Sequence, residues 1–371
     1  MKLIIYIKRF LSILLGTTIV FIIVIFCQDN FFFFNDNNSW IIKNFYKEEK
    51  NTIDVIVIGS SEVIAGYFPG LAYKDKKITS YPIAVDASSI SLWKYQIEEV
   101  LKTQTPKIFL IEISGALYDN DEKIFDDAAL RRYSDNTPLS CNKINMLSNM
   151  KLKDSLLSYY FPGIKYHSDL KNSQNAFTEK CYFDSIEASK LKGVITCTSV
   201  DKTPIISYDS SAKSRLNITS ENYLNDFFDY CKQKGIEKSV VFIRFPHKIT
   251  SKNDAELIYK KNTVKHLVTT NGFDFIDMAN DAKKYNLDYQ KDFYNINHLN
   301  VYGAEKATSY LIDFLCSKYN IHGRTQDKWT NINWNSAADF SEHFIVLAKD
   351  KISSGEEMWL SEGTELLKVM K

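Results

Sequence analysis

The stretch "DVIVIGSSEVIAG", Asp54–Gly66, decides the fold of this 371-residue chain. Its first residues, Asp54–Ile58, are mostly apolar and β-branched, which favours a buried strand. Gly59, Ser60 and Ser61 follow, and then a run that can begin a helix. A serine at such a corner serves as a turn residue, a helix cap, a phosphate ligand or a nucleophile. The stretch is not a P-loop, because no Gly-Lys-Ser/Thr follows, and it lacks the glycine pattern of a dinucleotide-binding motif.

Four more apolar runs repeat the strand pattern along the chain, with helical segments between them. Ser89–Thr103 has apolar residues at helical spacing and Pro106 ends it, while Ala304–Leu315 marks a closing helix. Continuous apolar strands that alternate with amphipathic helices are typical of a parallel sheet covered on both faces. We therefore predict an α/β fold with a five-stranded, doubly wound parallel sheet. The four runs are Tyr81–Val85, Lys107–Ile113, Ser239–Phe245 and Phe273–Met278.

A long segment, residues 114–238, interrupts this rhythm after the third predicted strand. Within it, Leu139–Phe161 has helical character, whereas Asn172–Thr203 is irregular and polar. An insertion at the carboxyl end of a strand is where an α/β fold builds a substrate cover. We predict a core domain over residues 50–320 that includes this insertion, and a C-terminal extension over residues 321–371.

An uncharged run of 18 residues, Phe10–Cys27, dominates the N-terminus. As a helix it would be about 27 Å long, close to the hydrocarbon thickness of a bilayer. Lys2, Lys8 and Arg9 precede it, so the positive-inside rule places the N-terminus in the cytoplasm. A cleaved signal peptide is the alternative, but the run is long for one and no small-x-small site follows. We expect a cytoplasmic stub over 1–9, a single-pass cell-membrane anchor over 10–27, a juxtamembrane linker over 28–49, and an extracytoplasmic remainder.

Composition argues against several classes of function. The formal net charge is +1 and no zinc-finger or Arg-rich stretch is present, so we expect no nucleic-acid partner. The six cysteines show no CxxC spacing, so we expect no metal site, and nothing requires an organic cofactor. Cys181 and Cys197 are the nearest pair for a disulfide, but we expect mostly buried free thiols.

A nucleophilic serine needs a base, and two of the six histidines follow predicted strands. His298 lies in "DFYNINHLNVYGAEKA", just before the closing helix, and that loop returns to the sheet edge that carries Ser61. His247, in "RFPHK" after the fourth strand, is the competing base. Structural roles remain open for these residues, with Ser60 or Ser61 as a helix cap and His298 as a buried capping side chain.

The pieces "VIGSSE" and "NHLNVYGAEK" resemble motifs of the SGNH/GDSL hydrolase superfamily, with a likeness over roughly residues 50–318. They are most similar to membrane-anchored bacterial members that partner membrane-bound O-acyltransferases, among them those of D-alanine transfer in teichoic acid synthesis. The resemblance implies a flavodoxin-like three-layer sandwich, the SGNH hydrolase fold. It also implies Ser61 as the nucleophile and His298 as the base.

An oxyanion hole made of backbone N–H groups follows from the same resemblance. Ser61 would supply one donor, and the family's second motif matches "AVDASS", so Ala87 or Ser88 would supply another. The glycine that the family usually has there is absent. The asparagine of the third motif is not evident in "EISGALYDN", where Asn120 is a loose match.

One position departs from the family pattern, because Asn295 stands where the family has an aspartate, three residues before the histidine. An aspartate would hold the imidazole tautomer and stabilise the protonated ring, whereas asparagine orients the ring without a negative charge. Asp292, six residues before His298, would substitute if the loop folds back. The site is therefore a Ser-His-Asn arrangement, a rewired Ser-His-Asp arrangement, or a weakened enzyme.

These observations lead to three hypotheses of different classes. The first is an extracytoplasmic serine esterase or O-acyltransferase that acts on acetyl or D-alanyl esters of cell-envelope polysaccharide or teichoic acid. The second, motivated by Asn295, is a catalytically weakened accessory or scaffold partner of a membrane-bound O-acyltransferase. The third is a surface interaction protein that merely retains the fold.

Overall fold

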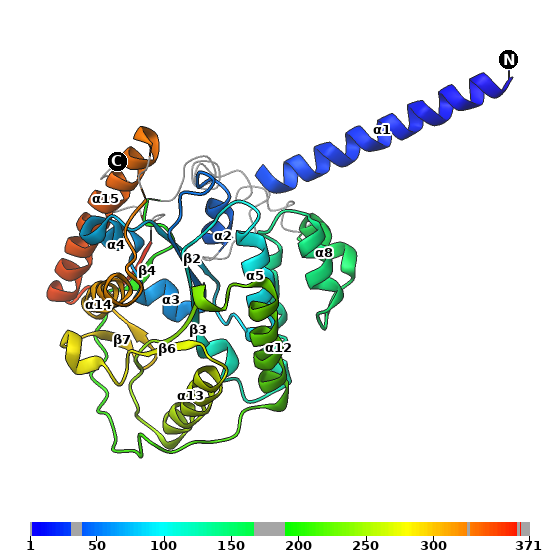
Figure 1. Cartoon of the computed structure of the whole chain (residues 1–371). Helices are drawn as coiled ribbons and strands as arrows, with labels where there is room; N and C mark the ends of the chain where they lie inside the picture. The colour runs from blue at the N-terminus through cyan, green and yellow to red at the C-terminus, as the bar shows by residue number, and fades with distance from the viewer. Residues whose placement is uncertain (1, 31–38, 167–189, 325–326, 362–363, 365–371) are drawn as a thin grey trace.

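The structure is a computed structural model of the whole chain. It describes residues 2–30, 39–166, 190–324, 327–361 and 364. A central sheet lies between two layers of helices, and one long helix projects from this body (Figure 1). The predicted α/β architecture is confirmed.

The sheet has five parallel strands in the order β2-β1-β3-β5-β6. All five were predicted, and each observed end lies one residue from the predicted one. Counted along the chain, this is the doubly wound order 2-1-3-4-5, in which the winding direction reverses next to the first strand. The strands are β1 (Val55–Gly59), β2 (Ser80–Ala84), β3 (Ile108–Glu112), β5 (Val240–Arg244) and β6 (Asp274–Asp277).

The register of the strands brings their carboxyl ends to one edge. Gly59 of β1 pairs with Ala84 of β2, and Glu112 of β3 pairs with Ile243 of β5. In a doubly wound sheet, ligands bind outside this edge at the point where the winding reverses. Ser61 follows β1 directly at this point.

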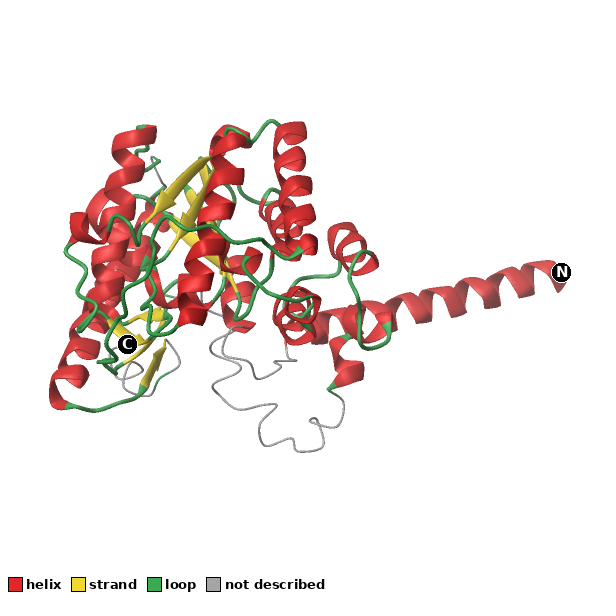
Figure 2. Cartoon of the chain, turned by 90° about the horizontal axis from the view of Figure 1, so that it is seen from below, coloured by secondary structure: helices red, strands yellow, loops and turns green. Residues whose placement is uncertain are grey.

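Helices cover both faces of the sheet (Figures 1 and 2). One layer contains α3 (Ser61–Gly66), α4 (Pro69–Lys76) and α14 (Val301–Tyr319), and the other contains α5, α12 and α13. The predicted helix over 89–103 is a 3₁₀ turn, η1 (Ile90–Leu92), that continues into α5 (Trp93–Val100). Helix α12 (Ile218–Lys234) lies in the segment predicted as insertion, yet it belongs to the layer on the sheet. The last helix of this layer is α13 (Lys252–Thr270).

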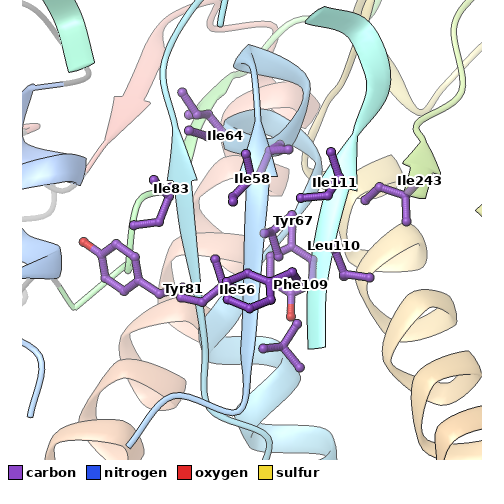
Figure 3. Packing of buried hydrophobic residues seen from close by; sticks show 14 of the residues in the cluster. Ile56, Ile58, Ile64, Tyr67, Tyr81, Ile83, Phe109, Leu110, Ile111 and Ile243 are labelled. Carbon is purple, nitrogen blue, oxygen red and sulfur yellow. The ribbon is translucent and has the colours of Figure 1, made fainter. Parts of the chain in front are cut away.

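Four of the five strands are buried along their whole length because helices lie on both sides, whereas the first two residues of the edge strand β6 are only half-buried. All five residues of β1, β2, β3 and β5 are buried. Figure 3 shows Ile56 and Ile58 of β1 between side chains of β2 and β3, with Ile64 and Tyr67 from the segment after β1 nearby. Burial on both faces is the reason that the sequences of these strands are unbroken apolar runs rather than alternations of apolar and polar residues.

In its described residues, 114–166 and 190–238, the rest of the insertion contains short helices and one small strand. Strand β4 (Ile195–Cys197) pairs antiparallel with β9 (Trp359–Ser361), so the insertion and the C-terminal extension meet in one two-stranded sheet. The extension also forms α15 (Lys328–Ser354), which packs on α4 through ring contacts such as Tyr73 with Trp334. The other elements are α2 (Ser39–Phe45), η2 (Ile113–Ala116), α6 (Asp121–Ile124), α7 (Asp127–Ser134), α8 (Cys141–Ser148), α9 (Leu156–Tyr160), α10 (Pro162–Lys165), η4 (Glu237–Ser239), η5 (Ala282–Tyr285), β7 (Phe293–Asn295) and β8 (His298–Leu299).

The projecting helix is α1 (Lys2–Asn30), and its segment Ile4–Phe26 is long and apolar enough to cross a membrane. Its apolar side chains are exposed in the structure, unlike those of a core helix. Length and composition are therefore sufficient for a membrane-spanning helix, but the apolar span runs from Ile4 to Phe26, so it begins six residues before the predicted anchor and includes Lys8 and Arg9.

Gly59 permits the close approach of β1 to β3 where the chain turns into α3. A Cβ atom added at Gly59 would lie 2.6 Å from Val63 Cγ2 and 2.7 Å from Glu112 Cβ. Overpacking of this kind costs about 1–3 kcal/mol. We predict that Gly59→Ala lowers the thermal unfolding midpoint of the full chain in detergent by several degrees. The matched control is Gly163→Ala in α10, where a Cβ meets nothing within 4 Å; equal midpoints for the two variants would contradict the prediction.

Candidate active site

The predicted nucleophile and base meet at the carboxyl edge of the sheet. Ser61 Oγ lies 2.8 Å from His298 Nε2, although 237 residues separate the two in sequence. Ser61 begins α3 directly after β1, and His298 begins β8 just before α14. Ser61 is partly exposed, so its hydroxyl is within reach of a substrate.

Neither serine of the corner serves as a side-chain cap of α3. Ser60 occupies the N-cap position, but its side chain makes no capping hydrogen bond. Its hydroxyl donates instead to Glu112 Oε2 at 3.3 Å. Since Ser61 faces His298, the helix-cap interpretation of both residues is wrong.

Asn295 sets the tautomer of His298 through a tight turn between β7 and β8. Its Oδ1 accepts hydrogen bonds from the backbone N–H groups of Asn297 and His298, each at 2.9 Å. These two donors require the side-chain oxygen, not the nitrogen, to face the turn. His298 Nδ1 lies 2.9 Å from the same oxygen and must therefore carry the proton. Nε2 is left with its lone pair toward Ser61, which is the tautomer that a general base needs.

The surroundings of His298 keep the ring neutral. Burial lowers the pKa of His298 to about 4; the Glu62 carboxylate opposes this, while His247 and Arg244 act with it. A neutral imidazole is ready to accept a proton at pH 7. A base whose pKa lies this far below neutrality is nevertheless a weak one, because proton transfer is most efficient when the pKa is near the working pH.

Asp292 does not take the place of the missing carboxylate. Its side chain is fully buried and its Oδ2 accepts from Lys306 Nζ at 2.7 Å and from the Asp288 N–H at 2.7 Å. Within the described part of the chain, no hydrogen bond joins Asp292 to His298. The geometry therefore favours the Ser-His-Asn alternative over the rewired Ser-His-Asp one.

The loop after β2 contains the predicted oxyanion donors. The Ser88 N–H already donates to Val85 O at 3.1 Å, which leaves Ala87 as the better placed of the two. Ala87 has φ of 57°, a left-handed conformation that favours glycine. Ala87 thus bears the strain of a side chain in a conformation that glycine adopts freely. Asn120, by contrast, is exposed and caps α6, so it takes no part in the site.

A buried charge cluster lies directly behind the nucleophile. Arg244, the last residue of β5, donates from Nη1 to both carboxylate oxygens of Glu62, at 2.7 and 2.6 Å. The same nitrogen lies 3.1 Å from Oε1 of Glu112, the last residue of β3. Ser114 bonds to all three side chains. This cluster ties the first turn of α3 to the ends of two strands.

The two buried carboxylates of the cluster are not stabilised equally by the positive charge of Arg244. Burial raises the pKa of Glu112 to about 7, and the Glu62 charge adds to it against the effect of Arg244. Burial also disfavours ionisation of Glu62, but Arg244 and His247 outweigh it and hold the pKa of Glu62 well below its usual value. Glu62 and Arg244 are therefore the charged pair, while Glu112 carries a proton for much of the time near pH 7.

His247, the competing base, belongs to this cluster and not to the nucleophile. Its Nε2 lies 2.8 Å from Glu62 Oε1, and Arg244 Nη2 lies within 3.1 Å of both ring nitrogens. Burial and the charge of Arg244 lower the pKa of His247. No hydrogen bond connects it to Ser61 among the residues that the structure describes.

Two aromatic rings extend the site beyond His298. Tyr294 stacks on the imidazole with centroids 5.3 Å apart and planes at 1°. Trp359 of β9 meets Tyr294 edge to face at 5.5 Å and is 61% exposed. The exposed Trp359 is thus separated from the base, His298, by a single aromatic ring, that of Tyr294.

Cofactor sites are not evident in the described residues. No group of three or more His, Cys, Asp or Glu side chains there could hold a metal ion. Cys141, Cys197, Cys231 and Cys316 are free thiols, as expected, but only Cys231 is buried. Cys181, the proposed partner of Cys197, lies outside the described residues.

Sequence reasoning missed the charge cluster and the aromatic rings. A signal for the cluster was present, since "KIFLIEI" and "SVVFIRF" each place one charge at the end of an apolar strand, Glu112 and Arg244. Buried charges at strand ends are paired in nearly all proteins, so the two could have been assigned to each other. No pattern in the sequence marked Trp359 as a site residue, because only the pairing of β4 with β9 brings it to the site.

Two comparisons with known proteins found no match for this chain. A scan against protein-family models finds no match, and a search of curated proteins finds no significantly similar sequence. The likeness to the SGNH/GDSL superfamily therefore rests on the motifs and on the geometry described above.

We predict that Asn295→Asp strengthens the base. A carboxylate at this position would accept the same hydrogen bonds and raise the pKa of His298 by about 1–3 units. Since the base works only when neutral, activity is lost as pH falls through this pKa, near 4 in the natural protein. The acid limb of kcat/KM for a small acetyl ester should thus move to higher pH, and the plateau should rise about tenfold or more.

Asp292→Asn is the control for this variant. It disturbs the buried contact with Lys306 and should lower the unfolding midpoint, but it should leave the acid limb in place. A shift of the limb in Asp292→Asn with none in Asn295→Asp would assign the role to Asp292 instead.

Proposed function

We propose that this protein is a membrane-anchored, extracytoplasmic serine esterase or O-acyltransferase of the SGNH/GDSL type. Its substrates would be acetyl or D-alanyl esters of a cell-envelope polysaccharide or teichoic acid. The observation that carries the proposal is the hydrogen-bonded line from Ser61 through His298 to Asn295 at the carboxyl edge of the sheet. A serine facing the free nitrogen of an oriented, neutral imidazole is the arrangement of a covalent acyl-transfer site.

The first half-reaction would load the acyl group onto the serine. His298 Nε2 takes the proton of Ser61 while Oγ bonds to the acyl carbon, and the carbonyl electron pair moves onto oxygen. The N–H groups of Ser61 and Ala87 would stabilise that oxyanion. As the tetrahedral intermediate collapses, the bond to the leaving oxygen breaks and this oxygen takes the proton from His298.

The second half-reaction would release the acyl group. A water molecule, or a hydroxyl of the acceptor polymer, gives its proton to His298 and attacks the acyl carbon. The bond to Ser61 Oγ breaks, and the serine regains its proton. Water gives hydrolysis and a polymer hydroxyl gives transfer, so one site serves both reactions.

Asn295 favours a second candidate, a weakened accessory partner of a membrane-bound O-acyltransferase. The imidazolium that forms during each half-reaction has no adjacent carboxylate to stabilise it. Replacing the carboxylate of a triad by an amide costs about four orders of magnitude in rate in a well-studied enzyme, partly through the wrong tautomer. Here the turn between β7 and β8 holds the His298 tautomer that has its proton on Nδ1. The expected loss of rate therefore comes only from the missing negative charge.

The substrate class is supported by the anchor and by the aromatic edge. A chain whose helix α1 spans the membrane, with Lys8 and Arg9 near its cytoplasmic end, would hold the site next to the cell envelope. The exposed face of Trp359 suits the apolar C–H face of a sugar ring, and its contact with Tyr294 would place such a ring beside His298.

The decisive test of the function uses Ser61→Ala. The full chain in detergent should hydrolyse p-nitrophenyl acetate and react with a fluorophosphonate probe at Ser61, as measured by intact mass. Ser61→Ala should lose the mass shift and lower kcat/KM by at least about 100-fold. Ser60→Ala, which removes only the 3.3 Å bond to Glu112, should keep most of the activity. If cellular envelope acylation and hydrolysis both survive Ser61→Ala, the accessory hypothesis replaces the enzymatic one.

A separate measurement tests the carbohydrate contact. Trp359→Ala should raise KM for an O-acetylated chito-oligosaccharide by roughly three- to tenfold, because a ring contact of this kind is worth about 0.5–1.5 kcal/mol. The same variant should leave kcat/KM for p-nitrophenyl acetate unchanged, since that ester is too small to reach the indole. Trp329→Ala, at a 72% exposed tryptophan on α15, is the matched control. Equal effects of the two variants would remove Trp359 from the substrate path.

A further inference from the structure

Two short helices of the insertion, α9 and α10, turn their large aliphatic side chains to the outside. In α9, Ser158 is buried whereas Leu156 and Leu157 are 39% and 59% exposed. In α10, Ile164 is 50% exposed. In a surface helix of a globular protein the leucines normally face the core, whereas in α9 Tyr159 is the large side chain that is buried. We call Leu156, Leu157 and Ile164 the apolar patch.

This inverted arrangement is held by a buried arginine. Arg131 of α7 donates from Nη1 to Ser158 O at 3.2 Å and from Nη2 to Ser158 Oγ at 2.8 Å. Its guanidinium carbon also lies 3.7 Å from the ring centroid of Tyr159. Arg131 is only 5% exposed, so the polar face of α9 is fixed inward. The leucines are therefore presented outward by a rigid support and not by a loose loop.

The apolar patch is continuous with the membrane-spanning helix. Phe161, between α9 and α10, contacts Phe21 of α1 edge to face, with ring centroids 5.8 Å apart. The apolar span of α1 ends at Phe26, five residues after Phe21, which is about 7 Å along the helix axis. Helices that lie in a membrane interface are buried to about 5–10 Å. When α1 spans the bilayer, Phe161 is thus at the depth of an interfacial helix.

Lysines flank the patch in sequence, and two of them are paired with carboxylates, Lys151 with Asp121 and Lys165 with Asp154. The segment that contains α9 and α10 carries more lysines than acidic residues, and Lys153 is exposed. Lysines at the edge of an apolar surface reach lipid phosphates while their stems stay in the apolar layer. The charged residues of the segment are Lys151, Lys153, Asp154 and Lys165.

We propose that α9 and α10 form a second membrane contact, in which the apolar patch dips into the lipid leaflet next to the end of α1. The occupant of the patch is lipid, because the patch continues a segment that itself lies in the bilayer. A single helix would let the domain tilt and rotate above the membrane, whereas two contacts fix its orientation. This inference requires α1 in the bilayer and does not depend on the proposed catalytic function.

The test places a fluorescent reporter on the patch. Leu157→Trp and, as a control, Ile218→Trp on α12, where Ile218 is 68% exposed, are prepared in the full chain and reconstituted in lipid nanodiscs. The emission added by Leu157→Trp should be quenched at least twofold by lipids brominated in the acyl chain and little by aqueous iodide. The emission added by Ile218→Trp should be quenched by aqueous iodide and little by the brominated lipids. Unfolding midpoints equal to that of the natural chain check that both variants fold.

Two outcomes would overturn the proposal. In the first, the emission added by Leu157→Trp in nanodiscs is quenched by iodide and not by brominated lipid, which places the patch in water. In the second, iodide is excluded only in native membrane vesicles and not in nanodiscs of pure lipid, which assigns the patch to another membrane protein. Both readouts are independent of ester hydrolysis, so the failure of this proposal is distinct from the failure of the proposed function.

Discussion

The buried cation of Arg244 is the interaction on which the candidate site depends. It joins β5 to Glu112 at the end of β3 and to Glu62 in the first turn of α3, immediately after the nucleophile. Removal of one partner from a buried ion pair typically costs about 3–5 kcal/mol, because the other charge remains without a counter-ion. The cluster therefore holds Ser61 in register with two strands. The position of Glu112 also explains why residue 59 is a glycine, because a Cβ atom there would collide with the Glu112 side chain.

Hydrogen bonds align Ser61, His298 and Asn295, whereas the electrostatic support of the histidine is weak. The amide oxygen of Asn295 provides the orientation and tautomer that an aspartate would provide, because it accepts from two backbone N–H groups and from the ring. It cannot provide charge. Burial then lowers the pKa of His298 to about 4, and Arg244 adds to this effect. For the proposed function, this implies a slow acyl transfer or an accessory role.

The insertion and the C-terminal extension add structural features that the sheet lacks. Together they form the small sheet of β4 and β9, which brings Trp359 to Tyr294 beside the base. The insertion alone provides α9 and α10, whose leucines face outward next to α1. The sheet edge thus carries Ser61, whereas the additions place Trp359 near His298 and the exposed leucines of α9 next to α1.

The sequence by itself determined the elements whose signal is local. The five strands, the apolar span of α1 and the order of Ser61 and His298 could be predicted, because strand burial, hydropathy and motif spacing are properties of neighbouring residues. Only the tertiary structure decided that Asn295 and not Asp292 orients the imidazole, since the outcome depends on which side chain the turn of β7 and β8 directs inward. The pairing of Arg244 with Glu62 likewise joins residues 182 positions apart. Such contacts are set by how strands and helices pack, and no pattern along the chain encodes that packing locally.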